Sequence, residues 1–256
     1  AYALDANISS NNSTAIGYAA LSLNTGASNT AVGASAMVDN TSGVNNTAIG
    51  VNSLTNNTTA SFNIALGGSS LAANTTGASN TAVGYTALTA NTTASNSTAV
   101  GYQALTANTT GATNTAFGKG ALLANTTGNT NVAVGANALA ANVDGDKSVA
   151  VGVDALAAQD PASNVDMYNV AVGDSAGKSV TTGVENTLIG ALAGDAITTA
   201  SNTTAVGKSA LGANTTGNNN TAVGYNAMDA ATTGIQNSAL GANALGALTT
   251  GNNNVG

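Results

Sequence analysis

The stretch Asn80-Thr81-Ala82-Val83-Gly84 returns, with small changes, along the whole chain. Its last residue, which we call the phrase glycine, recurs mostly every 17 residues, as between Gly84 and Gly101. The phrase glycines are Gly17, Gly33, Gly50, Gly67, Gly84, Gly101, Gly118, Gly135, Gly152, Gly173, Gly190, Gly207, Gly224, Gly241 and Gly256. A fixed short period is the signature of a repeat architecture. The sequence therefore predicts a stack of similar units rather than a globule.

The composition of the 256-residue chain suits a thin core of small side chains. Hydrophobic residues make up 43% of the chain, yet only 3% is aromatic and Trp is absent. With 6% charged residues and a net charge of -7, the chain lacks the clustered cations that nucleic acid or anionic lipid requires. No apolar run reaches the about 18 residues of a membrane span, so no membrane insertion is expected.

The residue inventory also argues against catalysis and cofactors. His and Cys are absent, which removes a Ser-His relay and the usual zinc and iron sites. Asp144 and Asp146 are weak candidates for a calcium site, although their spacing matches no EF-hand loop. The plainer interpretation is that they are solvated turn acids. We expect no enzyme, no metal and no cofactor.

Within one unit, three segments follow each other. Thr81, Ala82 and Val83 alternate in character, which is typical of a short strand that ends at Gly84. The second apolar point, Ala87-Leu88, predicts a second strand, and Asn-Thr-Thr-Gly supplies turn chemistry. This punctuation leaves no uninterrupted stretch for a helix.

The predicted fold is an all-β, parallel β-solenoid (a β-roll) of about fifteen 17-residue coils. Stacked coils lie about 4.8 Å apart, so fifteen coils would form a rod of roughly 70 Å. We expect one continuous array over residues 1–256. The step from Gly152 to Gly173 is longer and holds Pro161, which predicts a loop insertion at about residues 157–169.

An asparagine four residues before the phrase glycine is a candidate structural ladder. These strand asparagines are Asn29, Asn46, Asn63, Asn80, Asn114, Asn131, Asn169, Asn186, Asn220 and Asn237. Stacked identical amides can hydrogen-bond along a ladder, as in cross-β assemblies. A row that binds a ligand is the alternative. Val83, Gly84, Val100 and Gly101 are expected in the same ladder.

The residue two before the phrase glycine is Ala almost throughout, with Leu188 as the exception. An outward stripe of small residues would invite another chain to pack closely. The competing interpretation is that this Ala fits a tight coil interior.

Two further features concern the surface. Tyr18, Tyr85, Tyr102 and Tyr225 each follow a phrase glycine, either as exposed contacts suited to stacking on sugars or as side chains packed at the coil corner. Sequons such as Asn74-Thr75-Thr76 would accept glycans on a glycosylating export route.

The repeated Asn-Thr-Ala-Val-Gly-x-x-Ala-Leu, as at Asn80 to Leu88, resembles the head repeats of YadA-like trimeric autotransporter adhesins. It resembles even more the related repeats of phage-type tail-fibre proteins. The resemblance covers essentially the whole chain. It implies a left-handed parallel β-roll and a homotrimer, although the 17-residue unit is longer than the usual adhesin unit.

We therefore expect a structural and adhesive extracellular fibre segment, on a cell-surface appendage or a virion. Its partners would be itself and a surface glycan or host-cell receptor, but neither nucleic acid nor membrane. The alternative is a self-assembling filament, because Gly256 read on into Ala3-Leu4 and Asn7 continues the repeat, so uncapped ends could stack head to tail. An ice-binding solenoid, based on rows such as Thr75 and Thr92, and a polysaccharide-cutting enzyme are weaker alternatives.

Overall fold

The computed structural model describes residues 3–5 and 11–256, and Asn7 lies outside the described residues. The chain divides into two compact units, Ala1–Thr127 and Gly128–Gly256, each of which is a parallel β-solenoid. No described helix is long and apolar enough to cross a membrane. The prediction of an all-β parallel solenoid is confirmed for both units.

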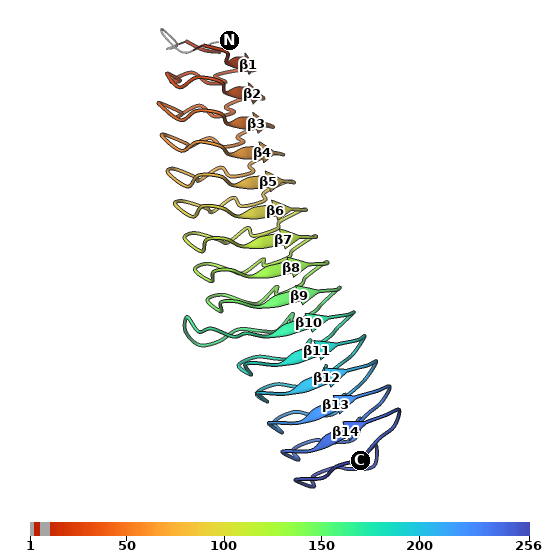
Figure 1. Ribbon diagram of the computed structural model, residues 1–256. Coiled ribbons are helices and arrows are strands. Elements are labelled where there is room, and N and C mark those ends of the chain that lie inside the picture. Colours follow the sequence, from red (N-terminus) through yellow and green to blue (C-terminus); the bar gives the residue numbers. More distant parts are fainter. Residues whose placement is uncertain (1–2, 6–10) are drawn as a thin grey trace. The chain divides into compact units, whose positions relative to one another are not determined.

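In unit 1, every coil contributes one three-residue strand to a parallel ladder (Figure 1). The strands are β1 (Thr14–Ile16), β2 (Thr30–Val32), β3 (Thr47–Ile49), β4 (Ile64–Leu66), β5 (Thr81–Val83), β6 (Thr98–Val100) and β7 (Thr115–Phe117). Consecutive strands pair in register, so Ala82 lies between Ala65 and Ala99. Equivalent residues therefore form straight rows along the ladder.

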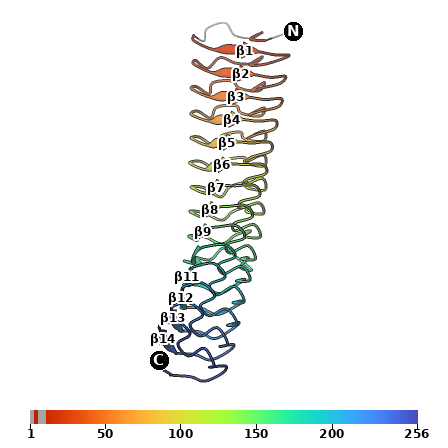
Figure 2. The ribbon, with the colours of Figure 1, turned by 90° about the vertical axis from the view of Figure 1, so that its right-hand side faces the viewer.

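Unit 2 repeats the arrangement. Its strands are β8 (Val132–Val134), β9 (Val149–Val151), β10 (Val170–Val172), β11 (Thr187–Ile189), β12 (Thr204–Val206), β13 (Thr221–Val223) and β14 (Ser238–Leu240). Each again pairs with its neighbour in sequence, and Figure 2 shows β11 to β14 following one another in order.

The predicted second strand is wrong: the Ala-Leu segment is a run of turns. Thr86 and Leu88 have φ values of 54° and 52°, in the left-handed region, which a strand residue does not adopt. Their N–H groups donate to opposite neighbours, Thr86 to the Gly68 carbonyl of the preceding coil and Leu88 to the Ala104 carbonyl of the next. These bonds offset a backbone cost of roughly 1–2 kcal/mol per left-handed residue.

The core of each coil is thin and built from small side chains. In the coil of β5, the strand residue Ala82 and the turn residues Ala87 and Leu88 are fully buried. Alanine on one side and leucine on the other fill the narrow space between strand and turn run. This pairing explains how a chain with so few aromatic residues buries a core.

In unit 2 one strand residue is large, and two turn residues beside it are small. Leu188 replaces the strand alanine of β11, and Gly177 and Gly194 replace the leucines that would face it. A Cβ at Gly177 would lie 2.6 Å from Leu188 Cδ1, and one at Gly194 would lie 2.9 Å from Leu188 Cδ2. The leucine side chain therefore occupies the volume that the two glycines vacate.

The 21-residue step before β10 forms a loop on the surface, and Figure 1 shows it as the longest of the unit's turns. Residues 162–166 are exposed, whereas Pro161 and Met167 are buried. Both pack toward Gly145, where a Cβ would lie 3.1 Å from each of their Cγ atoms. The loop is thus held by its two ends.

Candidate interaction surface

Each strand turns one face outward, and we call the residues one and three before the phrase glycine the outer strand face. In unit 1 the apolar row of this face includes Ile16, Ile49 and Phe117, which are 61%, 43% and 57% exposed. Val83 and Val100 lie in the same row and are half-buried by their neighbours along the ladder. Because the strand alternates, the row follows directly from the burial of the alanine between them.

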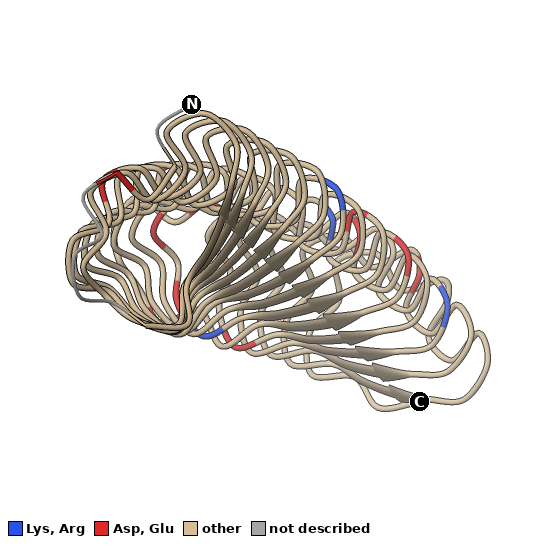
Figure 3. Cartoon of the chain, turned by 90° about the horizontal axis from the view of Figure 1, so that it is seen from above, with Lys and Arg blue, Asp and Glu red and all other residues tan. Residues whose placement is uncertain are grey.

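The same face of unit 2 is also free of charge. Its apolar row runs through Val134, Val151, Val172, Ile189, Val206, Val223 and Leu240. Figure 3 shows the strands without any blue or red segment, since every charged residue lies in the turns and loops. The outer strand face is therefore a regular, uncharged surface in both units.

The alanine stripe does not face outward. Ala31, Ala65, Ala82 and Ala99 are fully buried inside the coil of a single chain. The expected outward stripe is therefore wrong, and the competing interpretation, that the alanine fits a tight interior, is confirmed. The geometric reason is that Val and Thr, on the other side of the strand, are too large for the space opposite Leu88.

The corner tyrosines are exposed rather than packed inside. Tyr18, Tyr85 and Tyr102 are 63%, 58% and 48% exposed, and Tyr225, in unit 2, is 52% exposed. Tyr85 and Tyr102 belong to adjacent coils and stack, with ring centroids 6.0 Å apart and an interplanar angle of 12°. The pair forms a two-ring aromatic contact beside the outer strand face of unit 1.

The strand asparagines are buried and bond to the backbone. Asn80 donates from Nδ2 to the Ala94 carbonyl at 2.8 Å, and its own N–H donates to Asn63 Oδ1 at 2.9 Å. Asn63 and Asn46 repeat this pattern one coil earlier. The ladder in these coils therefore runs from amide to backbone instead of from amide to amide. Amide-to-amide contacts occur between Asn237 and Asn220, at 3.2 Å.

The remaining strand asparagines are distributed over both units. Asn29, Asn114, Asn131, Asn169, Asn186 and Asn220 are also fully buried. Asn29 and Asn186 reach the carbonyl of the next coil's turn, as Asn131, Asn169 and Asn220 do. The row has no accessible amide with which to contact a ligand.

A second asparagine row, which the sequence analysis treated only as turn chemistry, makes the amide ladder of unit 1. Asn91 donates from Nδ2 to Asn74 Oδ1 at 2.8 Å and to the Ala94 carbonyl at 3.1 Å. Asn108 donates to Asn91 Oδ1 at 3.0 Å. The same link joins Asn24, Asn40, Asn57, Asn74, Asn91, Asn108 and Asn125. These turn asparagines carried a signal in their strict spacing, the same as that of the strand row.

Burial of the turn asparagines bears on the sequons. Asn74 and Asn108 begin Asn-Thr-Thr sequons, yet both side chains are fully buried in the ladder. Sequons whose asparagine is exposed begin at Asn45 and Asn96, at the corner before the strand. A glycan on the folded chain therefore has room at exposed asparagines, such as Asn45 and Asn96 at the corner and Asn56 in the turn run, and not at the buried turn asparagines.

The threonines that follow the turn asparagines have their hydroxyls engaged. Thr75 Oγ1 donates to the Thr92 carbonyl at 3.1 Å, and Thr92 Oγ1 donates to the Thr109 carbonyl at 3.2 Å. These hydroxyls link coils, so this row does not offer the regular free hydroxyls that an ice-binding surface requires.

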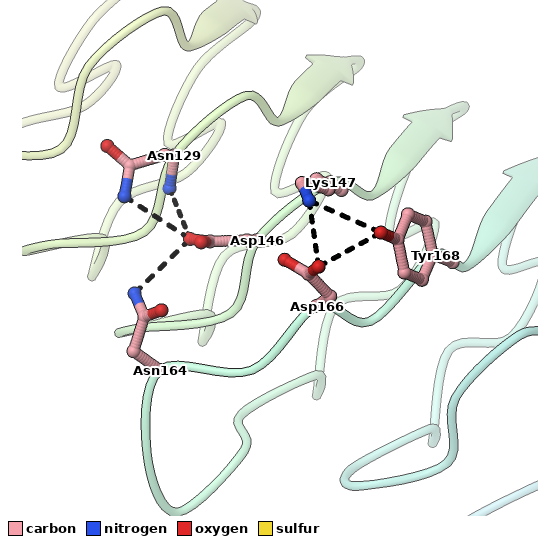
Figure 4. A network of polar contacts seen from close by, with 6 residues as sticks. All are labelled: Asn129, Asp146, Lys147, Asn164, Asp166 and Tyr168. Carbon is pink, nitrogen blue, oxygen red and sulfur yellow. Dashed lines mark hydrogen bonds and ion pairs between the residues drawn. The ribbon is translucent and has the colours of Figure 1, made fainter.

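The acidic segment of unit 2 is organised as a loop anchor (Figure 4). Asp146 Oδ1 accepts from the Asn129 N–H at 2.6 Å and from Asn164 Nδ2 at 3.4 Å. Asn164 also donates to the Asp144 carbonyl at 3.2 Å. Within residues 3–5 and 11–256 there is no group of three or more acidic, His or Cys side chains that could hold a metal. The two aspartates thus bond within the protein, to the inserted loop.

A second cluster lies beside it. Lys147 Nζ is 2.7 Å from Asp166 Oδ2 and 3.2 Å from the Tyr168 hydroxyl, which itself donates to Asp166 at 2.9 Å (Figure 4). The hydrogen bond from Lys147 holds the pKa of Asp166 below its ordinary value, and the bond to Asp166 raises the pKa of Lys147. All three groups are exposed, so the cluster fastens the loop without forming a closed site.

A comparison with protein-family models found no match, and neither did a comparison with curated proteins. The geometry of the surface therefore carries the functional argument.

Proposed function

We propose that the chain is a structural and adhesive segment of an extracellular fibre, on a cell-surface appendage or a virion, without catalytic activity. One observation carries the proposal: the asparagines that recur in most coils are turned inward. The turn asparagines of unit 1 are fully buried and bond to each other, which leaves stiffness and a repetitive surface as the properties the repeat supplies.

The resemblance to YadA-like adhesin heads and tail-fibre repeats supports a homotrimer with left-handed coils. An uncharged, partly apolar surface on an otherwise acidic chain is compatible with such self-association. Fibre segments of this kind must hold their length, and a ladder with buried, paired amides resists local opening.

The adhesive part of the proposal rests on the tyrosine pair. Tyr85 and Tyr102 present stacked, exposed rings that can contact a glycan or a receptor. A glycan array with the full chain and with Tyr102→Ser tests this. Binding that the variant loses supports the contact, and undiminished binding by the variant assigns the adhesion elsewhere.

The second candidate is a filament formed by head-to-tail stacking of solenoid coils. It is favoured by the uniform register of the ladder, in which β5 pairs with β4 and with β6 through the same three positions. Any coil therefore presents the bonding pattern that another coil requires.

Mass in solution together with electron microscopy of the full chain separates the candidates. Discrete rods of three-chain mass are the expected result. Long unbranched filaments would favour the head-to-tail filament over the trimer. A monomeric mass at every concentration, without fibres, would contradict both.

A further inference from the structure

The outer strand face of unit 1 differs from the turns of the same unit in three ways that bear on a partner. The first is apolarity. Ile49 and Phe117 leave 43% and 57% of their side chains exposed, and Ile64 in the neighbouring row leaves 41%. Exposed apolar side chains in continuous rows, rather than scattered singly, mark an interaction surface.

The second difference is charge. Unit 1 holds only three of the chain's charged residues, Asp5, Asp39 and Lys119, and all three lie outside its strands. No strand residue of β1 to β7 is charged. This face is therefore one along which two copies of the same acidic chain can approach without like-charge contact.

The third difference is regularity. The rows of β1 to β7 repeat with the spacing of a parallel ladder, about 4.8 Å. A second copy carries rows with the same spacing, so side chains of one row can fit between those of the other along the whole unit. Val and Ile are stiff at χ1, which lowers the entropy lost on such packing.

The face also offers exposed apolar area. Phe117 is 57% exposed, which corresponds to on the order of 100 Å² from its ring. Ile16, Ile49 and Ile64 are 61%, 43% and 41% exposed. The aliphatic rows add to this, toward the roughly 800 Å² per partner of a stable interface.

We infer that the outer strand face of unit 1 is the surface against which a second copy of this chain packs. The inference rests on the proposed function, because it names the contact within the proposed multimer. The Val and Ile row is the contact, and the buried alanine row takes no part in it.

The chain has no Cys, so single cysteines report on this contact without background. Ile49→Cys places a thiol on the outer strand face, and Thr59→Cys places one on the exposed turn of the same coil. In the assembled protein we expect maleimide to react at least about tenfold more slowly at residue 49 than at residue 59, a protection equivalent to about 1.4 kcal/mol. In denaturant the two rates become equal.

A charge test complements the thiol test. The pair Val83→Lys and Val100→Lys introduces like charges on the face, and Thr93→Lys with Thr110→Lys places the same charges on exposed turns of the same coils. The first pair shifts the mass to that of a monomer with an unchanged circular dichroism spectrum, whereas the second pair leaves the mass unchanged.

The outcomes separate the inference from the proposed function. A multimeric mass with fast labelling of Ile49→Cys, or a multimer that survives both lysines at Val83 and Val100, overturns the inference and leaves the fibre segment standing. A wild-type chain that is monomeric at every concentration overturns both.

Discussion

At the scale of the residue, phrase glycines such as Gly84 and Gly101 stand where the backbones of two coils meet. Gly256 is an exception, because Val255 pairs with Ser238 and places Gly256 beside Ala239 instead of Gly241. Gly101 has a φ of +137°, and a Cβ placed there would lie 2.5 Å from the Gly118 carbonyl oxygen. Neither the conformation nor the distance tolerates a side chain. The period of the sequence is thus a consequence of coil stacking, because the backbone at the corner of each coil lies directly against the corner of the next coil.

Gly101→Ala is expected to lower the free energy of unfolding by at least roughly 1–3 kcal/mol, the cost of a strained backbone position, with the clash in addition. Thermal and urea unfolding measure it. Gly68→Ala is the control, since a Cβ there comes no nearer than 3.3 Å to any atom, in this case the flexible Tyr85 ring. We expect the control to change stability by less than about 0.5 kcal/mol. Equal losses in both variants would contradict the role of the corner.

The turn asparagines allow an equally direct test. Asn91→Asp removes the Nδ2 donor and leaves a buried carboxylate facing the Asn74 Oδ1 and Ala94 carbonyl oxygens. We expect a loss of more than about 3 kcal/mol at neutral pH, because an unpaired buried charge is costlier than a neutral group. Burial raises the pKa of such a carboxyl, so the charge-dependent part of the loss is absent below the ordinary pKa of about 3.9 and grows as the pH rises from there to the raised pKa.

The control makes the same chemical change at an exposed residue of the same coil. Asn96→Asp is expected to change stability by less than about 0.5 kcal/mol. Unfolding curves at neutral and acid pH for both variants provide the measurement. An Asn91→Asp protein as stable as Asn96→Asp at neutral pH would mean that the amide ladder contributes nothing.

At the scale of the element, the coils of β10 and β11 show that strand and turn run are fitted to each other. Leu188 faces Gly177 and Gly194, whereas Ala82 belongs to a coil with Leu88. The sequence displays Leu188 as an exception, but the compensation is visible only when the facing residues are known.

A double-mutant cycle tests that fit. Leu188→Ala leaves a cavity and is expected to cost about 2–5 kcal/mol. Gly194→Leu overpacks against Leu188 and Ile197 and is expected to cost about 1–3 kcal/mol. The double variant restores the usual pairing and should lose less than the sum by about 0.5–3 kcal/mol in thermal unfolding. Strictly additive losses would show that these side chains do not share one space.

The cluster of Lys147, Asp166 and Tyr168, which fastens the loop of unit 2, stabilises the loop over a defined pH range. Because the pKa of Asp166 is lowered, its contribution is present above the ordinary value of 3.8 and is lost as the pH falls through the lowered value. The pKa of Lys147 is raised, so its contribution is lost only as the pH rises above 10.5. The loop should stay fastened between these limits.

An NMR titration of the Asp166 carboxyl measures this directly. The midpoint is expected below 3.8 in the wild-type chain and closer to 3.8 in Lys147→Ala, in which the hydrogen bond from the Tyr168 hydroxyl remains. Lys208→Ala should leave the midpoint unchanged, since Lys208 takes part in neither of the two ion pairs found among the described residues. A wild-type midpoint at the ordinary value would mean that Lys147 and Asp166 are not paired in solution.

At the scale of the whole molecule, the period predicts stacked coils and a parallel strand register, and the longer step with Pro161 predicts an inserted loop. The period does not predict the backbone conformation of Ala87-Leu88, because a short apolar pair is compatible with a strand and with a run of turns. Left-handed φ values at residues such as Leu88 are rare enough that sequence reasoning passes over them. The same limit hid which side of the strand faces outward.

The surface was less predictable than the fold. Which asparagine row pairs amide to amide depends on whether Nδ2 reaches a side chain or a carbonyl, a difference that spacing does not encode. Asn80 and Asn91 have the same period and different partners. The proposed function is supported by the buried hydrogen bonds of the asparagines and by the uncharged outer strand face, and each unit shows both features.

Hydrogen exchange of the asparagine side-chain amides, followed by NMR in the full chain, tests the central claim most directly. The claim is that the recurring polar groups are used inside the coils. Amide protons of the buried residues Asn74, Asn91 and Asn108 should exchange at least about tenfold more slowly than those of the exposed residues Asn45 and Asn96. Equally fast exchange at all five would mean that the ladder is open to water and would contradict the account.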